Sequence, residues 1–157
     1  MSKSVSMGAI LKAVNEDIKN LDKNNIDGES SRTPTLHDKY TRLLYYEKVE
    51  LESMKLAMKV LYRKLTEYYS GKADPEEYKK KPFAIKLKKD IDLYIESDET
   101  YIAAQQQVIL QTEKVEYLKG IVNQINSRSF HLNNMLNYQR FKHGADKLGD
   151  HNYMDND

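Results

Sequence analysis

Aromatic and cationic side chains alternate densely between residues 62 and 81. Tyr62-Arg63-Lys64 is followed by Tyr68-Tyr69-Ser70-Gly71-Lys72 and then by Tyr78-Lys79-Lys80-Lys81. Single-stranded nucleic acid is bound by this combination, because cations contact phosphates and aromatic rings stack on unpaired bases. The segment therefore indicates a site for single-stranded nucleic acid without a hydrogen-bonding code for particular bases.

The cations also have helical spacing. Lys55, Lys59 and Arg63 follow one another at intervals of four residues, which predicts a basic stripe along one face of a helix. A solvated lysine face with its tyrosines in a helical core would give the same pattern, and both interpretations stay open. A membrane surface is less favoured, because the rings are tyrosines without a face of Trp, Phe or Leu for insertion. The candidate DNA-binding residues are Lys59, Arg63, Lys64, Tyr69, Lys72, Lys79, Lys80, Lys81, Lys88 and Lys89.

Charge is strongly segregated along a chain whose totals nearly cancel, with 25 Lys and Arg against 24 Asp and Glu. Residues 55–89 carry eleven basic and four acidic groups, whereas residues 90–100 carry five carboxylates and no basic group. Residues 114–143 are again basic, and residues 144–157 have a net charge of −3. The near-zero net charge therefore conceals a strong segregation of charge along the chain.

Catalytic and metal-binding patterns are missing from the sequence. It has no cysteine, its histidines never pair at metal-ligand spacing, and no nucleophile elbow occurs. Gly71-Lys72 is followed by Ala73 and does not form a phosphate-binding loop. No apolar run approaches the roughly 18 residues of a membrane span, and the apolar stretch at the N-terminus is too short for a signal peptide. We expect a cytoplasmic, helical protein that is not an enzyme and needs no cofactor.

Apolar periodicity predicts the first two helices. Residues 7–21 form an amphipathic helix, and the polar stretch 22–34 is interpreted as a flexible connector. A long helix should begin at Thr33 or Thr35, with Pro34 in its first turn, and end near Ser70. Its apolar seam has one polar interruption, Glu47, and consists of Tyr40, Leu44, Leu51, Met54, Met58, Leu61, Leu65 and Tyr68.

The second half of the chain predicts three further helices. Asp74-Pro75 starts a short one, and residues 83–95 are assigned as helix although their alternation also fits a strand. The last helix should run from Ser97 or Asp98 to Lys142, with a bend at residues 127–129 and Gly144 as its C-cap. Gln111 and Ser129 interrupt its apolar stripe. The expected fold is all-α, with a helix (1–21), a linker (22–34), a DNA-binding and oligomerisation domain (35–143) and a disordered acidic tail (144–157).

The apolar stripe of the last helix is wider than one partner helix within the chain would bury. We therefore expect a closed homo-oligomer larger than a dimer, in which neighbouring subunits cover the surplus surface. The candidate oligomerisation residues are Val115, Leu118, Val122, Ile125, Leu132 and Leu136.

Two blocks resemble a known family. Leu65-Thr-Glu-Tyr-Tyr-Ser-Gly-Lys72 and Ile125-Asn-Ser-Arg-Ser-Phe-His-Leu132 are similar to segments of the UvsY family of tailed-phage recombination mediators, with Tyr-Tyr-Ser-Gly and Ser-Arg-x-Phe as matching cores. The spacing of the blocks also fits, so the resemblance covers roughly residues 40–144. The family's DNA-contacting cations precede Tyr-Tyr-Ser-Gly and carry over best to Arg63. Lys64 stands one position from the second cation, where this chain has Leu65.

The resemblance implies a non-enzymatic protein of the host cytoplasm during phage infection. It would bind single-stranded DNA as a homo-oligomeric ring, hexameric or heptameric, and weaken the hold of the phage single-strand-binding protein. It would then load a RecA-like phage recombinase for recombination, repair and recombination-dependent replication. The alternative is a coiled-coil structural or adaptor protein that does not bind DNA.

Overall fold

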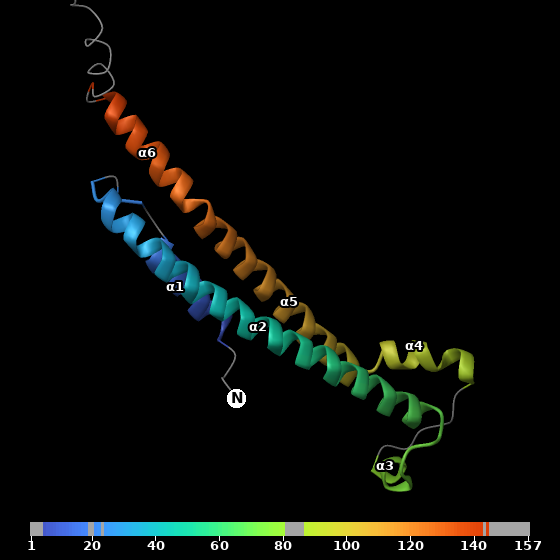
Figure 1. The fold of residues 1–157 in the computed structure, drawn as a ribbon. Coiled ribbons are helices and arrows are strands. Elements are labelled where there is room, and N and C mark those ends of the chain that lie inside the picture. The colour runs from blue at the N-terminus through green and yellow to red at the C-terminus, as the bar shows by residue number, and fades with distance from the viewer. Residues whose placement is uncertain (1–4, 19–20, 23, 81–86, 143, 145–157) are drawn as a thin grey trace, which may run out of the picture. The chain divides into compact units, whose positions relative to one another are not determined.

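The computed structural model describes residues 5–18, 21–22, 24–80, 87–142 and 144, and its elements are all helical (Figure 1). No strand occurs in these ranges, so the expected all-α class is confirmed. The chain forms two compact units, which are described separately. In chain order the helices are α1 (Met7–Ile18), α2 (Ile26–Tyr69), α3 (Pro75–Lys80), a 3-10 turn (Lys88–Asp90), α4 (Ile91–Glu96), α5 (Glu99–Asn126) and α6 (Arg128–Lys142).

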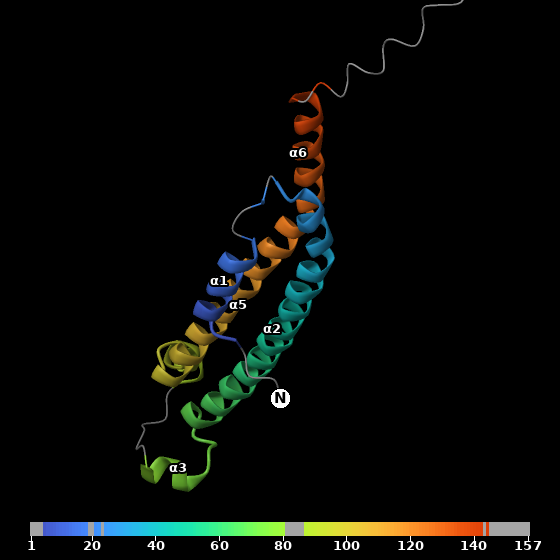
Figure 2. The ribbon, with the colours of Figure 1, turned by 90° about the vertical axis from the view of Figure 1, so that its left-hand side faces the viewer.

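Unit 1 comprises residues 44–117, and therefore the second part of α2, then α3, α4 and the first part of α5 (Figure 2). Within this unit α2 and α5 run antiparallel, because Glu47 contacts Gln111 whereas the ring of Tyr62 contacts that of Tyr101. The buried apolar residues of unit 1 are Leu44, Leu51, Tyr68, Tyr69, Ile91, Ile95 and Val115.

The end of α2 is a Schellman motif built on Gly71. Gly71 has φ 77°, a left-handed conformation that glycine adopts without steric cost. The N–H of Lys72 donates to the carbonyl of Glu67 at 2.8 Å, and the N–H of Gly71 donates to that of Tyr68 at 3.2 Å. These two bonds satisfy carbonyls that the last helical turn leaves without partners. The Tyr78 hydroxyl donates a further bond to the Tyr68 carbonyl at 2.6 Å.

Aspartates cap helix α3, as predicted, and helix α5. The Asp74 carboxylate accepts a hydrogen bond from the Glu76 N–H at 2.9 Å at the start of α3. The Asp98 carboxylate accepts one from the Thr100 N–H at 2.9 Å at the start of α5. A capping carboxylate also lies favourably against the positive end of the helix dipole.

Unit 2 comprises residues 5–43 and the chain from residue 118 onward, and therefore α1, the first part of α2, the end of α5, and α6. The Asp17 carboxylate of α1 accepts hydrogen bonds from the Tyr40 hydroxyl at 2.9 Å and from Lys39 Nζ at 2.6 Å, which joins α1 to α2. The buried apolar residues of this unit are Ile10, Leu36, Tyr40, Leu118, Ile121, Ile125 and Leu132.

The predicted connector over residues 22–34 is wrong from Ile26 onward, because α2 begins there and not at Thr33 or Thr35. The Asn25 carboxamide oxygen caps it by accepting from the Gly28 N–H at 3.1 Å, and Asp27 lies in its first turn. Pro34 therefore lies inside the helix. Because proline has no N–H, the carbonyl four residues before Pro34 lacks its helical hydrogen-bond donor. That carbonyl is on the exposed side of α2, where water can bind it.

The other boundaries are close to the prediction. Helix α1 ends at Ile18, three residues earlier than expected. The predicted bend near residues 127–129 is confirmed, since Ser127 separates α5 from α6. Gly144 has φ 73°, as a glycine C-cap requires. The helix expected over 83–95 is present from Lys88 as a 3-10 turn and α4, while residues 83–86 and the tail from 145 lie outside the described residues.

Candidate nucleic-acid interface

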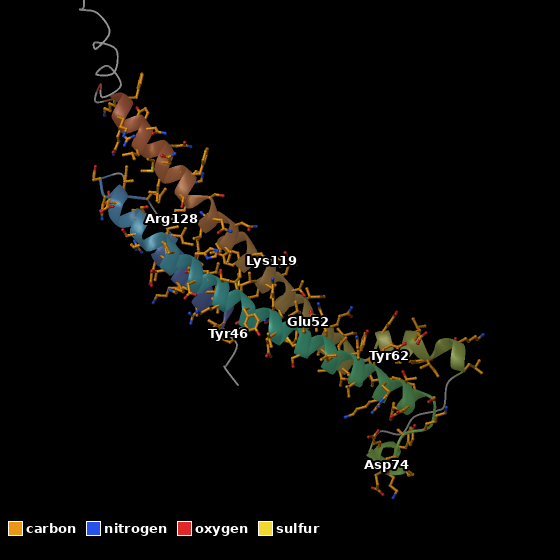
Figure 3. The ribbon with its side chains drawn as sticks, viewed as in Figure 1. Tyr46, Glu52, Tyr62, Asp74, Lys119 and Arg128 are labelled. Carbon is orange, nitrogen blue, oxygen red and sulfur yellow. The ribbon has the colours of Figure 1, made fainter. Side chains whose placement is uncertain are left out.

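A row of cations lies on the exposed side of α2 in unit 1. Lys48, Lys55, Lys59 and Arg63 are exposed, at spacings of seven and four residues, which place them on one face of a helix. The predicted stripe is thus separate from the buried seam. It lies in the part of α2 where Figure 3 labels Glu52 and Tyr62.

Two of these cations have carboxylate neighbours on the same helix. Lys55 Nζ lies 2.8 Å from Glu52 Oε1, and Arg63 Nε lies 3.7 Å from Glu67 Oε1. Both pairs are solvent-exposed, and such pairs typically contribute about 0–1 kcal/mol. A phosphate can therefore replace the carboxylate at little cost.

Lys59, Lys64 and Lys72 are exposed and have no ion pair among the residues that the structure describes. Lys64 lies about 100° around the helix from Arg63, as consecutive helical residues must. Lys72 directly follows Gly71, so the left-handed turn sets its position at the end of α2. These three candidate cations are all available to an anionic partner.

The remaining candidates lie outside α2. Lys79 is exposed in α3, with its Nζ 2.6 Å from Glu76 Oε1, and Lys89 is exposed in the 3-10 turn. Residue Lys81 and the side chains of Lys80 and Lys88 lie outside what the structure describes. The cationic segment 79–89 is therefore described only in part.

Tyr69 is a core residue, so the expectation that it lies outside the buried seam is wrong. Its side chain is 7% exposed, and its ring packs edge-on against Tyr68 and near Tyr94. Its hydroxyl donates to Asp98 Oδ2 at 2.8 Å. Burial, together with this hydrogen bond, raises the pKa of Tyr69 to about 12. A ring enclosed in this way leaves no face for a base.

Asp98 links this buried tyrosine to the start of α5. Burial alone would raise the pKa of the Asp98 carboxyl, but hydrogen bonds donated by Thr100 and Tyr69 outweigh it and hold the pKa below its usual value. The carboxylate therefore stays ionised while 6% exposed. The Tyr-Tyr-Ser-Gly block is thus architectural: its rings fill the core, and its glycine ends α2 just beyond the cations.

Exposed rings are instead supplied by Tyr45 and Tyr46, which the sequence reasoning missed. They are 63% and 55% exposed, and their centroids lie 5.7 Å apart in an edge-on arrangement (Tyr46 is labelled in Figure 3). The heptad register does indicate that these two rings are exposed. Because Leu44 occupies the seam, the next two residues must turn away from it by about 100° each. Lys48 follows them on the exposed side of α2.

Tyr62 has an intermediate position. It is 37% exposed, and its hydroxyl donates to Asp92 Oδ1 at 2.7 Å. This hydrogen bond raises the pKa of the Tyr62 hydroxyl. Its ring also meets that of Tyr101 in an edge-on arrangement, with the centroids 6.2 Å apart.

Most of the candidate oligomerisation residues are buried within the single chain. Val115, Leu118, Ile125 and Leu132 are 2%, 0%, 1% and 4% exposed, so the wide stripe is not an uncovered surface at these positions. Val122 and Leu136 are half-buried. The strongly exposed apolar side chains lie elsewhere: Val49, Leu56 and Val60 on α2, Ile109 and Leu110 on α5, and Phe130, Tyr138 and Phe141 on α6.

Neither a metal centre nor a membrane span is found in the described part of the chain. No group of three or more His, Cys, Asp or Glu side chains there could hold a metal ion. The described helices include none that is both long and apolar enough to cross a bilayer. Two carboxylates of the acidic segment 90–99 make structural contacts: Asp92 accepts a hydrogen bond from a tyrosine hydroxyl, and Asp98 caps α5.

Comparison with known proteins shows which proteins share this fold. Two crystal structures of the bacteriophage T4 recombination mediator protein UvsY share the fold, with TM-scores of 0.76 and 0.72. Their sequence identities are 16% and 15%, and each match covers 88% of this chain and 98% or 99% of the other. No curated protein sequence matches the chain. The family described as recombination, repair and ssDNA binding protein UvsY matches residues 13–145, and the chain therefore belongs to the UvsY family.

Proposed function

We propose that this protein binds single-stranded DNA through the exposed side of α2 and serves as a recombination mediator. The observation that carries the proposal is the row of exposed cations Lys48, Lys55, Lys59 and Arg63, which follows the exposed rings of Tyr45 and Tyr46 along α2. Cations at one-turn spacing follow a phosphate backbone, and solvent-exposed rings stack on bases of any sequence. The family description and the fold shared with the T4 mediator support the same role.

The DNA-binding set differs from that expected from sequence in its aromatic residues and in the added cation Lys48. Lys59, Arg63, Lys64 and Lys72 remain, with Lys79 and Lys89 as further cations. Tyr45 and Tyr46 replace Tyr69 as stacking residues, because Tyr69 is enclosed in the core. No hydrogen-bonding pattern for particular bases is involved, so the binding should be insensitive to sequence.

We further propose that copies of the chain assemble and that assembly strengthens DNA binding. One α2 row offers a short cationic track, and several copies on one strand gain through effective concentration. The assembled protein would weaken the hold of the phage single-strand-binding protein and load a RecA-like recombinase. Exposed apolar side chains on α2, α5 and α6 provide surfaces for such contacts.

A structural adaptor without DNA binding is the competing function. The adjoining face of α2 carries the exposed apolar residues Val49, Leu56 and Val60, which would suit a protein partner. The two functions differ in one measurable property. An adaptor retains no oligonucleotide at low salt, whereas a mediator binds one with strong salt dependence.

Fluorescence anisotropy with a labelled oligo-dT tests the proposal. The double variant Arg63→Ala/Lys64→Ala should bind at least about tenfold more weakly than the unaltered protein, because two charged contacts to phosphate are lost. The matched control is Lys12→Ala/Arg42→Ala, which removes one exposed Lys and one exposed Arg from unit 2. Equal weakening by both variants would show that only net charge matters and would reject the α2 row as the site.

A further inference from the structure

A buried cluster of charged residues lies in unit 2, where α2 meets the start of α6. The carboxylate of Glu29 pairs with Arg128 Nη2, and both side chains are more than nine-tenths buried. Arg32 Nη1 lies 3.5 Å from the other oxygen of Glu29. The neighbouring carboxylate, Asp17, is paired with Lys39. One carboxylate thus lies between two guanidinium groups, and the cluster keeps an excess positive charge.

One hydrogen-bond donor of Arg128 is unsatisfied. Its Nε is buried and has no hydrogen-bond partner among the described residues. Leaving such a donor unsatisfied is costly, so buried N–H groups nearly always meet an acceptor, from the protein, from water or from a ligand. Glu29 engages the Nη2 side of the guanidinium and leaves the Nε side for another acceptor.

A pocket of about 50 Å³ adjoins this guanidinium. Its polar lining consists of Arg128, Gln124 and His131, and its apolar lining consists of Ile18, Leu21 and Ile125. Among the residues that the structure describes, no acidic side chain belongs to the lining. Arginine, amide and imidazole groups can all donate hydrogen bonds, so the chemistry of the pocket fits an acceptor-rich, negatively charged group.

The volume limits the size of that group. A single water needs roughly 10–15 Å³ of such a cavity, so the pocket holds a few waters or one small ion. We propose that this pocket is a binding site for an oxyanion of phosphate size, received by the guanidinium of Arg128, the carboxamide of Gln124 and the imidazole of His131. The ligand is either free phosphate or the terminal phosphate of a nucleic acid. This site goes beyond the proposed DNA-binding row, which lies in unit 1.

Isothermal titration of the full chain with inorganic phosphate at constant ionic strength tests the site. We expect saturable binding of one phosphate per chain. Gln124→Leu and His131→Ala should each weaken it by about tenfold, because one hydrogen bond to a charged ligand is lost. Both residues are exposed enough for the substitutions to leave the fold intact, which circular dichroism would verify. Gln105→Leu, an exposed glutamine of α5 in unit 1, is the matched control and should leave phosphate binding unchanged.

Titration of Arg128→Lys with phosphate separates the contribution of the positive charge from that of the guanidinium geometry. Lysine keeps the positive charge but lacks the planar array of N–H donors of a guanidinium group. Phosphate binding should therefore be lost even where the variant remains helical. Absence of saturable phosphate binding by the unaltered protein would overturn the proposal and leave the pocket to water. Equal phosphate affinity in Gln124→Leu and in the unaltered protein would also overturn it.

Oligonucleotides with and without a 5′-phosphate distinguish the two sources of the anion. If a nucleic-acid terminus enters, the 5′-phosphorylated strand binds more tightly and Gln124→Leu removes the difference. If free phosphate is the ligand, both strands bind equally and Gln124→Leu leaves their affinity unchanged, while phosphate titration remains positive. Failure of the proposed DNA-binding function would abolish oligonucleotide binding altogether and leave the phosphate titration intact, so the two proposals fail separately.

Discussion

Glu47 of α2 and Gln111 of α5 are hydrogen-bonded to each other in the interior of unit 1. Gln111 Nε2 donates to Glu47 Oε2 at 2.6 Å and to the Glu47 carbonyl at 3.0 Å. Lys114 Nζ lies 3.1 Å from the same carboxylate oxygen, and Glu47 is 2% exposed. The polar interruptions of the two apolar seams thus satisfy each other, and they fix the register in which α2 and α5 pack.

Replacing Glu47 by alanine should lower the free energy of unfolding by about 3–5 kcal/mol, because a buried amide and a largely buried ammonium lose the carboxylate that faces them. Urea unfolding followed by circular dichroism measures this loss. Glu50→Ala removes the same side chain from an exposed position of α2. That control should change the free energy of unfolding by about 0.5 kcal/mol at most. A loss for Glu47→Ala no greater than that of Glu50→Ala would contradict the register-fixing role.

The sequence predicted much of this fold because local signals decide it. Helical periodicity, the aspartate cap at Asp74 and the glycine C-cap at Gly144 act within a few residues, and the structure contains all of them. The sequence does not predict the start of α2 at Ile26. Asn25 is also a typical loop residue, and a proline usually marks the boundary of a helix, whereas Pro34 lies eight residues after the start of this one. Its capping contact to Gly28 is visible only once the helix exists.

Contacts between distant residues could not be predicted from one sequence. The pairing of Glu29 with Arg128 joins residues 99 positions apart, and neither has a local sequence signal for burial. The heptad register of α2, taken alone, puts Tyr69 outside the apolar seam. Helix α4 brings Ile91 and Ile95 against its ring, so the core includes a side of α2 that the heptad pattern leaves polar.

Alanine in place of Gly71 should be strained, because the backbone there has φ 77°. We expect Gly71→Ala to destabilise the protein by about 1–2 kcal/mol. Gly120→Ala is a control of opposite sign, since Gly120 lies inside α5, where a Cβ meets no atom within 4 Å. Alanine at that position should add roughly 0.5–1 kcal/mol of stability. Thermal unfolding of both variants measures the contrast, and equal effects would argue against the Schellman geometry at the end of α2.

Alkaline pH should weaken the contribution of Tyr69. Its pKa is about 12 in the fold, above its usual value of 10.0, so the folded state retains the proton where the unfolded chain has lost it. The contribution is therefore fully present below about pH 10 and is lost as the pH rises to about 12, and it amounts to about 2–3 kcal/mol. The difference in unfolding free energy between the protein and Tyr69→Phe should accordingly shrink over this range. Tyr138→Phe, at a 67% exposed position, should show no such change.

Salt should weaken binding of single-stranded DNA steeply. Each phosphate neutralised contributes about −0.7 to the slope of log affinity against log salt, so several contacts along α2 should give a slope steeper than about −2. Anisotropy titrations at a series of NaCl concentrations measure it. Arg63→Ala/Lys64→Ala should reduce the magnitude of the slope by about 1.4, two phosphate contacts' worth. Tight binding with a flat salt response would exclude the cationic row as the main contact.

Assembly should depend on exposed apolar residues and not on the buried stripe of α5. Leu118 is 0% exposed, so Leu118→Asp should unfold unit 2 by placing a carboxylate in its core. Phe141 is 75% exposed. It shares a face of α6 with Phe130 and Tyr138, which precede it by eleven and three residues. Phe141→Asp should therefore preserve helicity but reduce the mass of the assembly and its affinity for oligo-dT, since multivalent binding is lost.

Multi-angle light scattering and circular dichroism on both variants decide between the two surfaces. A helical Leu118→Asp variant of reduced mass would restore α5 as the assembly surface, because it would show that position 118 tolerates a charge within the monomer. A Phe141→Asp variant of unchanged mass would remove α6 from the assembly contacts. An unaltered protein that is monomeric at micromolar concentration would refute assembly altogether, and DNA binding would then rest on the single α2 row with its few phosphate contacts.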